Sequence, residues 1–243
     1  METLLDGGSP MTRQLPLDLK LRPRSSFENF LPGANHEALS ALRDVAAGIS
    51  TQHLLLSGGS GSGKTHLLEA VVRAATARGR RPRYLPLDEA DHLAPDLLDD
   101  LEQECDLLCI DDVQSVAGRP DWERALFALQ ARSGTCVWVT SSTAPPGLLG
   151  FAMPELATRL SAGLVYPLHA LDDGDKRELL RCRARELGLE LEPAVARYLL
   201  ERHARDLAGL MRFLDQIDVE SLRHQRRPTI AFIRGLETRE IDP

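Results

Sequence analysis

The chain has 243 residues, of which 43% are apolar and 27% are charged. This length suits one sizeable domain with a smaller one attached, and the composition is that of a globular chain, not a disordered or fibrous one. The formal net charge of −7 argues against a surface that binds duplex DNA as its main activity. Neither a membrane-length apolar run nor a secretory signal is visible, so we expect a cytoplasmic location and no membrane partner.

The first 32 residues have no helical or strand periodicity, and we predict an extended arm there. An amphipathic helix follows from Asn35 to about Ala47. Short apolar strands then alternate with helices. We predict strands at 53–57, 83–87, 106–110 and 135–140, and helices at 67–78, 96–103 and 122–132. Strands that are apolar on both faces and alternate with helices indicate a parallel sheet covered on both sides, which makes a three-layer α/β domain.

After residues 165–168 the strand pattern stops, and leucines recur at three- and four-residue spacing. This spacing predicts helices at 173–187, 193–203 and 206–225 and a short one near Ala231. We therefore expect a small helical domain that follows the sheet domain in the sequence. The predicted organisation is an arm at 1–26, an α/β domain at 27–168 and a helical domain at 169–243.

A glycine-rich turn, GGSGSGKT at residues 58–65, fits the phosphate-binding pattern G-x-x-x-x-G-K-[ST] without a mismatch. Its glycines let backbone N–H groups and the following helix N-terminus point at phosphates. Lys64 would reach the β- and γ-phosphates, and the Thr65 hydroxyl would ligate Mg²⁺. A flexible turn with a chance lysine is the alternative, which the flanking strand and helix disfavour. The predicted residues for ATP or ADP are Gly58, Gly61, Gly63, Lys64, Thr65 and His66.

Two carboxylates, Asp111 and Asp112, directly follow the apolar run that ends at Ile110. A P-loop needs a second acidic site for its magnesium, and Asp111 would project from the carboxyl end of a buried strand beside it. Asp112 stands in the position of a base for the attacking water. A solvated turn is the alternative for this pair alone, but the pair and the P-loop together predict nucleotide binding.

A P-loop, a strand that ends in Asp-Asp and a helical C-terminal domain together resemble the AAA+ ATPases, and within them the DnaA branch. Residues 27–35 are similar to the F-x-x-F-x-x-G-x-N segment of that branch. Residues 155–160 resemble its arginine-finger segment, and residues 205–209 resemble the sensor stretch on its lid. The resemblance runs from Phe27 to the C-terminus, and it implies a P-loop AAA+ domain followed by a helical lid.

The same resemblance implies roles for single residues. Phe30 and Leu31 would lie near the adenine, Arg205 would contact the chain's own nucleotide from the lid, and Arg159 would be a finger acting on a neighbouring active site. A surface ion pair with Glu155, four residues earlier, is the alternative for Arg159. An ordinary surface arginine is the alternative for Arg205.

A hexapeptide in the arm, QLPLDL at residues 14–19, is similar to the short peptides that dock into the bacterial sliding clamp, the β subunit of DNA polymerase III. Its leucines alternate, so an extended peptide places them on one side. Packing of the arm on its own domain is the alternative. The predicted clamp-binding residues are Gln14, Leu15, Leu17 and Leu19. Only about 15 residues follow Arg227, which is too few for the DNA-binding domain of DnaA. This combination resembles the Hda family of DnaA regulators.

Strong autonomous hydrolysis is not expected, because Thr143 and Ala144 stand where DnaA relatives carry aspartate and arginine. The resemblance implies a regulator that binds the DNA-loaded clamp, associates with its own copies, and uses Arg159 to stimulate hydrolysis of DnaA-bound ATP, which prevents re-initiation. Sequence-specific DNA binding is not expected. The competing hypotheses are a self-sufficient ATPase that loads a helicase or remodels a partner, and an initiator paralogue that binds DNA nonspecifically.

Overall fold

The structure is a computed structural model that describes residues 25–99, 101–132, 134–202 and 207–240. Five strands form one sheet in the order β2-β3-β4-β1-β5, and all four pairings are parallel. The strands are β1 (Leu54–Ser57), β2 (Pro82–Pro86), β3 (Leu107–Asp111), β4 (Val137–Ser142) and β5 (Leu164–Pro167). The predicted parallel sheet is therefore confirmed, and the carboxyl ends of all five strands lie at one edge.

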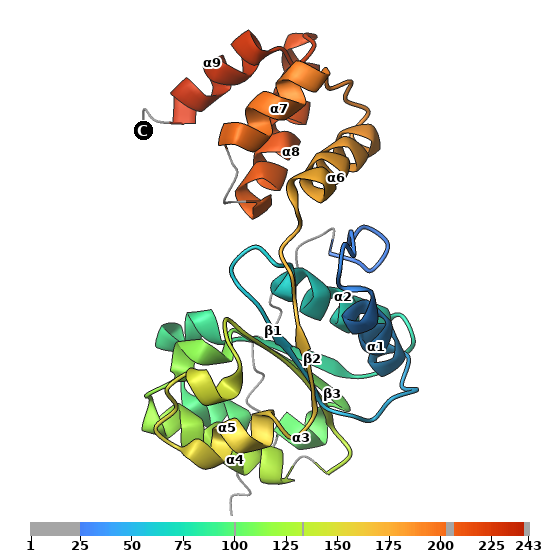
Figure 1. The fold of residues 1–243 in the computed structure, drawn as a ribbon. Helices are drawn as coiled ribbons and strands as arrows, with labels where there is room; N and C mark the ends of the chain where they lie inside the picture. The colour runs from blue at the N-terminus through green and yellow to red at the C-terminus, as the bar shows by residue number, and fades with distance from the viewer. Residues whose placement is uncertain (1–24, 100, 133, 203–206, 241–243) are drawn as a thin grey trace, which may run out of the picture.

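Helices cover both faces of this sheet (Figure 1). On one face lie α1 (His36–Ala46) and α2 (Lys64–Thr76), and on the other lie α4 (Pro120–Arg132) and α5 (Pro154–Leu160). Successive residues of β1 enter opposite cores: Leu54 and Leu56 pack with α1 and α2, whereas Leu55 packs with the α4 side. Buried apolar side chains on both strand faces explain the three layers.

The two tryptophans anchor the core on the α4 side. Trp122 on α4 and Trp138 in β4 are both essentially inaccessible to solvent. The ring of Trp122 also lies 5.8 Å from the guanidinium carbon of Arg119.

The connection from β2 to β3 corrects the predicted helix at 96–103. It contains the 3-10 helices η1 (Leu87–His92) and η2 (Pro95–Leu98) and one short α-helix, α3 (Leu101–Glu104). Asp99 is extended (φ −69°, ψ 128°), which interrupts the helix. Carboxylates crowd this stretch, and their mutual repulsion disfavours a continuous helix. The other 3-10 helices are η3 (Val113–Val116) and η4 (Pro146–Leu148).

The C-terminal part is helical and has its own apolar core. It contains α6 (Asp173–Glu186), α7 (Pro193–Arg202), α8 (Leu207–His224) and α9 (Ile230–Glu240). The last helix is longer than the short one we predicted. These helices lie beyond the carboxyl edge of the sheet (Figure 1), and their buried side chains form a cluster separate from the two sheet cores. None of the described helices combines the length and the apolar character that crossing a bilayer requires.

The segment before α1 joins the two parts of the molecule. Phe27 is buried in the core beside α1 and α2, so this segment is anchored in the α/β domain. The buried Asn35 amide donates to the His169 carbonyl (2.9 Å) and accepts from the His169 N–H (2.8 Å). His169 lies between β5 and α6, so Asn35 fixes the connection between the sheet and the helical part.

We expect Asn35→Ala to destabilise the chain, because both hydrogen bonds to His169 are lost. Each contributes about 0.5–1.5 kcal/mol, so the free energy of unfolding should fall by about 1–3 kcal/mol in urea titrations. The exposed amide of Gln52 provides a matched control, and Gln52→Ala should change stability far less. Equal effects of the two substitutions would contradict the assigned role of Asn35.

Candidate nucleotide-binding site

The P-loop turns from the carboxyl end of β1 into the first turn of α2. Gly63 is the N-cap of α2 and is left-handed (φ 93°), a backbone conformation that favours glycine. The first turn of α2 carries no acidic residue, and no side chain caps it. Because the first N–H groups of a helix lack intrahelical partners, this end of α2 presents donors and partial positive charge to an anion.

Lys64 is buried at the start of α2, with 7% of its surface exposed. Its ammonium donates to the carbonyl oxygens of Gly58 (2.8 Å) and Gly59 (3.0 Å) and therefore lies against the loop. Thr65 follows and is half-buried. The loop thus carries a positive charge beside the helix N-terminus, with a hydroxyl next to it.

Two glycines of the loop allow close approaches that a Cβ atom would block. A Cβ at Gly58 would lie 2.6 Å from the carbonyl oxygen of Leu168, and one at Gly63 would lie 2.7 Å from Cε2 of Phe30. Phe30 therefore packs directly on the P-loop, and the connection to the helical part passes beside it. The third predicted glycine, Gly61, has open space around it.

Three segments distant in sequence consequently meet at the P-loop: the stretch before α1, the loop itself, and the start of the helical part. In the first, Phe30 contacts the loop, the next residue, Leu31, is half-buried, and Gly33 lies against the start of the helical part. A Cβ at Gly33 would lie 2.9 Å from the carboxylate of Asp175 and 3.3 Å from Leu171. Phe30, one of the two residues predicted near adenine, is therefore adjacent to the predicted phosphate site.

Asp111 ends β3 at the carboxyl edge of the sheet and is 3% exposed. The Tyr84 hydroxyl on β2 donates to its Oδ2 (2.8 Å), and the Ser141 hydroxyl on β4 donates to its Oδ1. Burial, and next the Asp111 carboxylate, raise the pKa of Tyr84 well above its ordinary value, so this hydroxyl remains a donor. Hydroxyls from both neighbouring strands thus hold the carboxylate that was predicted to bind magnesium.

Asp112, the predicted base, has a left-handed backbone (φ 56°). Its carboxylate accepts from the Gln114 amide (2.8 Å), whose oxygen accepts from the Thr143 N–H (3.1 Å). Burial raises the pKa of Asp112, and the nearby Asp111 adds to this, whereas the bond from Gln114 lowers it. The side chain is therefore held by a glutamine.

The end of β4 is the part of this site that was missed from sequence. The Ser142 carbonyl accepts from the Gly58 N–H (3.0 Å), and the Ser141 hydroxyl accepts from the Asp112 N–H (2.9 Å). Both serines are fully buried. Because β4 lies between β1 and β3, the two residues connect the P-loop to the acidic pair. The available signal was two adjacent polar residues ending an apolar strand.

His66 lies at the side of the site, where it holds the stretch before α1. Its Nε2 is 2.9 Å from the Ser26 carbonyl oxygen, and its ring centroid is 5.6 Å from that of Phe30. One and two turns further along α2, Glu69 accepts from the Ser25 hydroxyl, and Arg73 donates to the Ser25 carbonyl (2.9 Å). The P-loop helix therefore grips the root of the arm.

Arg159 lies away from the other predicted site residues. It is near the end of α5, just before β5 begins at Leu164, and Leu164 pairs with the first residue of β1. This is the amino edge of the sheet, opposite the P-loop. The guanidinium lies 3.8 Å from the ring centroid of Phe127 and donates to its carbonyl (3.3 Å). Among the described residues, no ion pair joins Arg159 to Glu155, which was the alternative for this arginine.

Five predicted residues lie outside the described residues. They are Arg205, assigned to the nucleotide, and Gln14, Leu15, Leu17 and Leu19, assigned to the clamp.

Residues 21–167, more than half of the chain, match the sequence profile of the bacterial DnaA ATPase domain. The chain belongs to the bacterial DnaA ATPase family. Residues 173–236 match the profile of the Hda lid domain, so the helical part is a lid of the Hda kind. The resemblance deduced from the motifs is thereby confirmed, as is the AAA+ fold.

Solved structures of DnaA have the same fold. Domain III of DnaA from Thermotoga maritima is 24% identical, with a TM-score of 0.76, and the match covers 92% of this chain and 99% of that one. A DnaA bound to AMPPCP and single-stranded DNA is 25% identical, with a TM-score of 0.67, and the match covers 85% and 69%. The Holliday junction branch migration motor RuvB of Thermotoga maritima shares the fold at 18% identity and a TM-score of 0.66, over 90% and 72%.

We expect Asp112→Asn to stabilise the chain at neutral pH. The raised pKa means that the folded state favours the protonated carboxyl, so the wild type loses stability as pH rises through the window above the ordinary carboxyl value. Asparagine lacks this charge, still accepts from Gln114, and tolerates the left-handed backbone.

The gain measured by urea unfolding should therefore be largest at neutral pH and shrink toward pH ~4, near the ordinary aspartate value. The exposed Asp121→Asn on α4 is the control. A stability difference between wild type and Asp112→Asn that does not depend on pH would contradict the assignment.

Proposed function

We propose that this chain is a regulator of replication initiation that acts in the cytoplasm on DnaA. In this proposal the arm binds the sliding clamp on DNA through Gln14, Leu15, Leu17 and Leu19. The α/β domain at 27–168 faces ATP-bound DnaA, and Arg159 stimulates hydrolysis of the DnaA-bound ATP, which prevents re-initiation. The family membership and the Hda-type lid support this reading.

The position of Arg159 carries the proposal. The P-loop of this chain lies at the carboxyl edge of the sheet and Arg159 at the amino edge, so the arginine serves a site on another molecule. An arginine finger stabilises charge that develops on the transferred phosphoryl group. Stacking on Phe127 holds the guanidinium in a fixed orientation, and its partial exposure keeps it available to a partner.

The proposal includes ADP or ATP bound at this chain's own P-loop. Lys64 and the N-terminus of α2 would neutralise the phosphates, and Phe30 with Leu31 would border the adenine. Thr65 and Asp111 would hold Mg²⁺, which supplies charge neutralisation between the phosphates. Arg205 would reach the nucleotide from the lid. The DnaA structure with bound AMPPCP supports an adenine nucleotide as the ligand.

Weak autonomous hydrolysis fits the surroundings of Asp112. A general base must be free to reach the attacking water. Here Gln114 holds the carboxylate and also bonds Thr143, which stands where DnaA relatives carry an aspartate. Bound nucleotide would therefore set the shape of the protein more than it supplies energy.

A self-sufficient ATPase that loads a helicase or remodels a partner is the competing function, favoured by the complete set of Lys64, Thr65 and Asp111. Steady-state turnover by the purified chain distinguishes the two. A rate well above that of Asp111→Asn would favour the motor and would count against the regulator.

We expect Lys64→Ala to weaken ADP binding about 10- to 100-fold, because a hydrogen bond to a charged group contributes roughly 1.5–3 kcal/mol. Isothermal titration of the full chain with ADP and Mg²⁺ measures this effect. Lys176→Ala removes a lysine from the lid and should leave the affinity unchanged. ADP binding that survives in Lys64→Ala would remove the P-loop from the proposed site.

We expect Arg159→Ala to abolish stimulation of hydrolysis by DnaA, since arginine fingers contribute about 10³–10⁵ in rate. Released phosphate is measured in single turnovers of DnaA-bound ATP with clamp loaded on DNA. Arg124→Ala, which removes an exposed arginine from α4, is the matched control.

A second variant, Gln14→Ala with Leu15→Ala, should lose capture by immobilised clamp, whereas Arg159→Ala should retain it. The two variants therefore fail for different reasons. Full stimulation by Arg159→Ala would refute the finger, and unchanged clamp capture of the double variant would refute the arm motif.

A further inference from the structure

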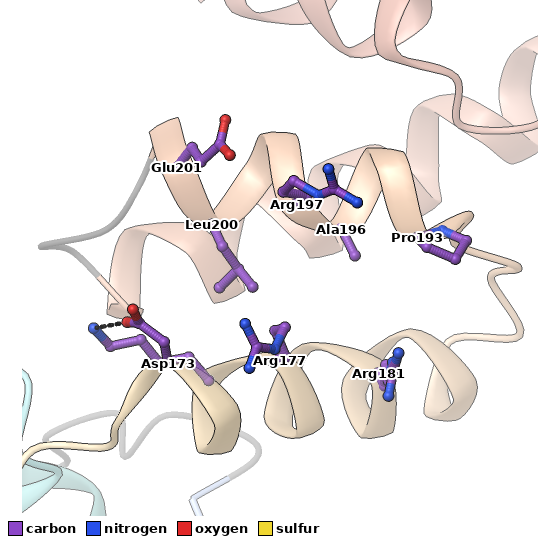
Figure 2. Close-up of a pocket in the computed structure, with 9 residues that line it drawn as sticks. Asp173, Arg177, Arg181, Pro193, Ala196, Arg197, Leu200 and Glu201 are labelled. Carbon is purple, nitrogen blue, oxygen red and sulfur yellow. Dashed lines mark ion pairs between the residues drawn. The ribbon is translucent and has the colours of Figure 1, made fainter.

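A cleft of about 540 Å³ lies in the lid between α6 and α7 (Figure 2). We call it the basic cleft. Its lining residues are Asp173, Lys176, Arg177, Arg181, Pro193, Ala196, Arg197, Leu200 and Glu201. Pro193, Ala196 and Leu200 give α7 an apolar wall, and cations from both helices surround it.

Arginines dominate the charge of this cleft. Arg177 and Arg181 stand one turn apart on α6, and Arg197 reaches in from α7 on the opposite side (Figure 2). Arg181 has a long contact with Glu178 (3.9 Å). Within the described part of the chain, neither Arg177 nor Arg197 forms an ion pair. Guanidinium groups bind carboxylates in a planar, two-pronged geometry, so the cleft suits a segment that carries carboxylates and apolar side chains.

The chain itself contains such a segment. Residues 87–104, the connection between β2 and β3, include eight of the 36 acidic residues and no lysine or arginine. We call this stretch the acidic segment. Asp88, Glu89 and Asp99 are exposed, and Leu93 and Leu97 are only partly buried against the core. It therefore offers carboxylates to the arginines of the basic cleft and apolar side chains to its apolar wall.

We propose that the basic cleft binds the acidic segment of a second copy of this chain. Within one molecule the two surfaces do not meet, because η2 of the acidic segment packs on α4 beside the sheet while α6 and α7 lie beyond its carboxyl edge (Figure 1). A contact that joins two different surfaces is heterologous and adds subunits in one direction. The inference depends on neither the arm nor bound nucleotide, so it stands apart from the proposed function.

The character of the contact follows from the groups that make it. Exposed ion pairs contribute roughly 0–1 kcal/mol each and are screened over about 10 Å in 0.1 M salt. Association through this surface is therefore weak, sensitive to salt, and completed by apolar contact of Ala196 and Leu200 with the segment.

Sedimentation equilibrium of the full chain at low and high salt tests the proposal. The cleft variant is Arg177→Glu with Arg197→Glu, and the segment variant is Asp88→Lys with Asp99→Lys. Each variant alone should self-associate at least about 10-fold more weakly, because like charges then face each other. Mixing the two should restore association, since the intact segment of one meets the intact cleft of the other.

Arg226→Glu with Arg227→Glu makes the same charge change elsewhere in the lid and should leave association unchanged. Thermal unfolding of each variant checks its fold, and Arg177→Gln with Arg197→Gln replaces a cleft variant that does not fold. A wild type that stays monomeric, variants that associate normally, or a mixture that stays dissociated would overturn the proposal. So would a cleft variant that keeps self-association but loses salt-dependent binding to duplex DNA. Clamp capture and DnaA hydrolysis are separate readouts, so their failure is distinguishable from this one.

Discussion

Two ionisable side chains, Lys64 and Asp111, are buried at the carboxyl edge of the sheet. Because each needs polar partners there, the rest of the site is arranged to supply them. A buried polar or charged group is tolerated only when other groups satisfy it. The P-loop carbonyls satisfy the ammonium, and hydroxyls from the two adjacent strands satisfy the carboxylate. These partners come from the loop, from Tyr84 within β2 and from Ser141 near the end of β4.

The same edge determines how the domains connect. After β5, Leu168 lies beside Gly58. Asn35 holds the residue that follows, His169, through two hydrogen bonds. The stretch before α1 is in turn held by His66, Glu69 and Arg73 on the P-loop helix. The root of the arm, the P-loop and the base of the lid therefore form one connected group of contacts. A change at the predicted phosphate site has a short physical path to both the root of the arm and the base of the lid.

Sequence predicted the parts of this arrangement that are local. The P-loop is contiguous, so its pattern placed Lys64 and Thr65 directly, and the apolar run before Asp111 placed that carboxylate at the end of a strand. Tyr84 and Ser141 were not predicted, since they reach Asp111 across 27 and 30 residues through strand pairing. Sheet order is not encoded in any single strand. The predicted continuous helix at 96–103 was wrong: two short helices stand there, separated by the extended Asp99, and repulsion among the carboxylates of this stretch disfavours a longer helix.

The distribution of functional groups over opposite edges of the sheet has a consequence for assembly. In the proposed function, the P-loop at one edge holds this chain's own nucleotide, and the arginine at the other edge is offered to another molecule. The lid adds a second asymmetry, because its cations stand between α6 and α7 whereas the densest run of carboxylates lies on the sheet domain. The P-loop and Arg159 lie at opposite edges of the sheet, and the basic cleft and the acidic segment lie on different domains. Neither pair is therefore arranged for a contact within one molecule. Both favour directional contacts between molecules, in which one face of a chain meets a different face of the next.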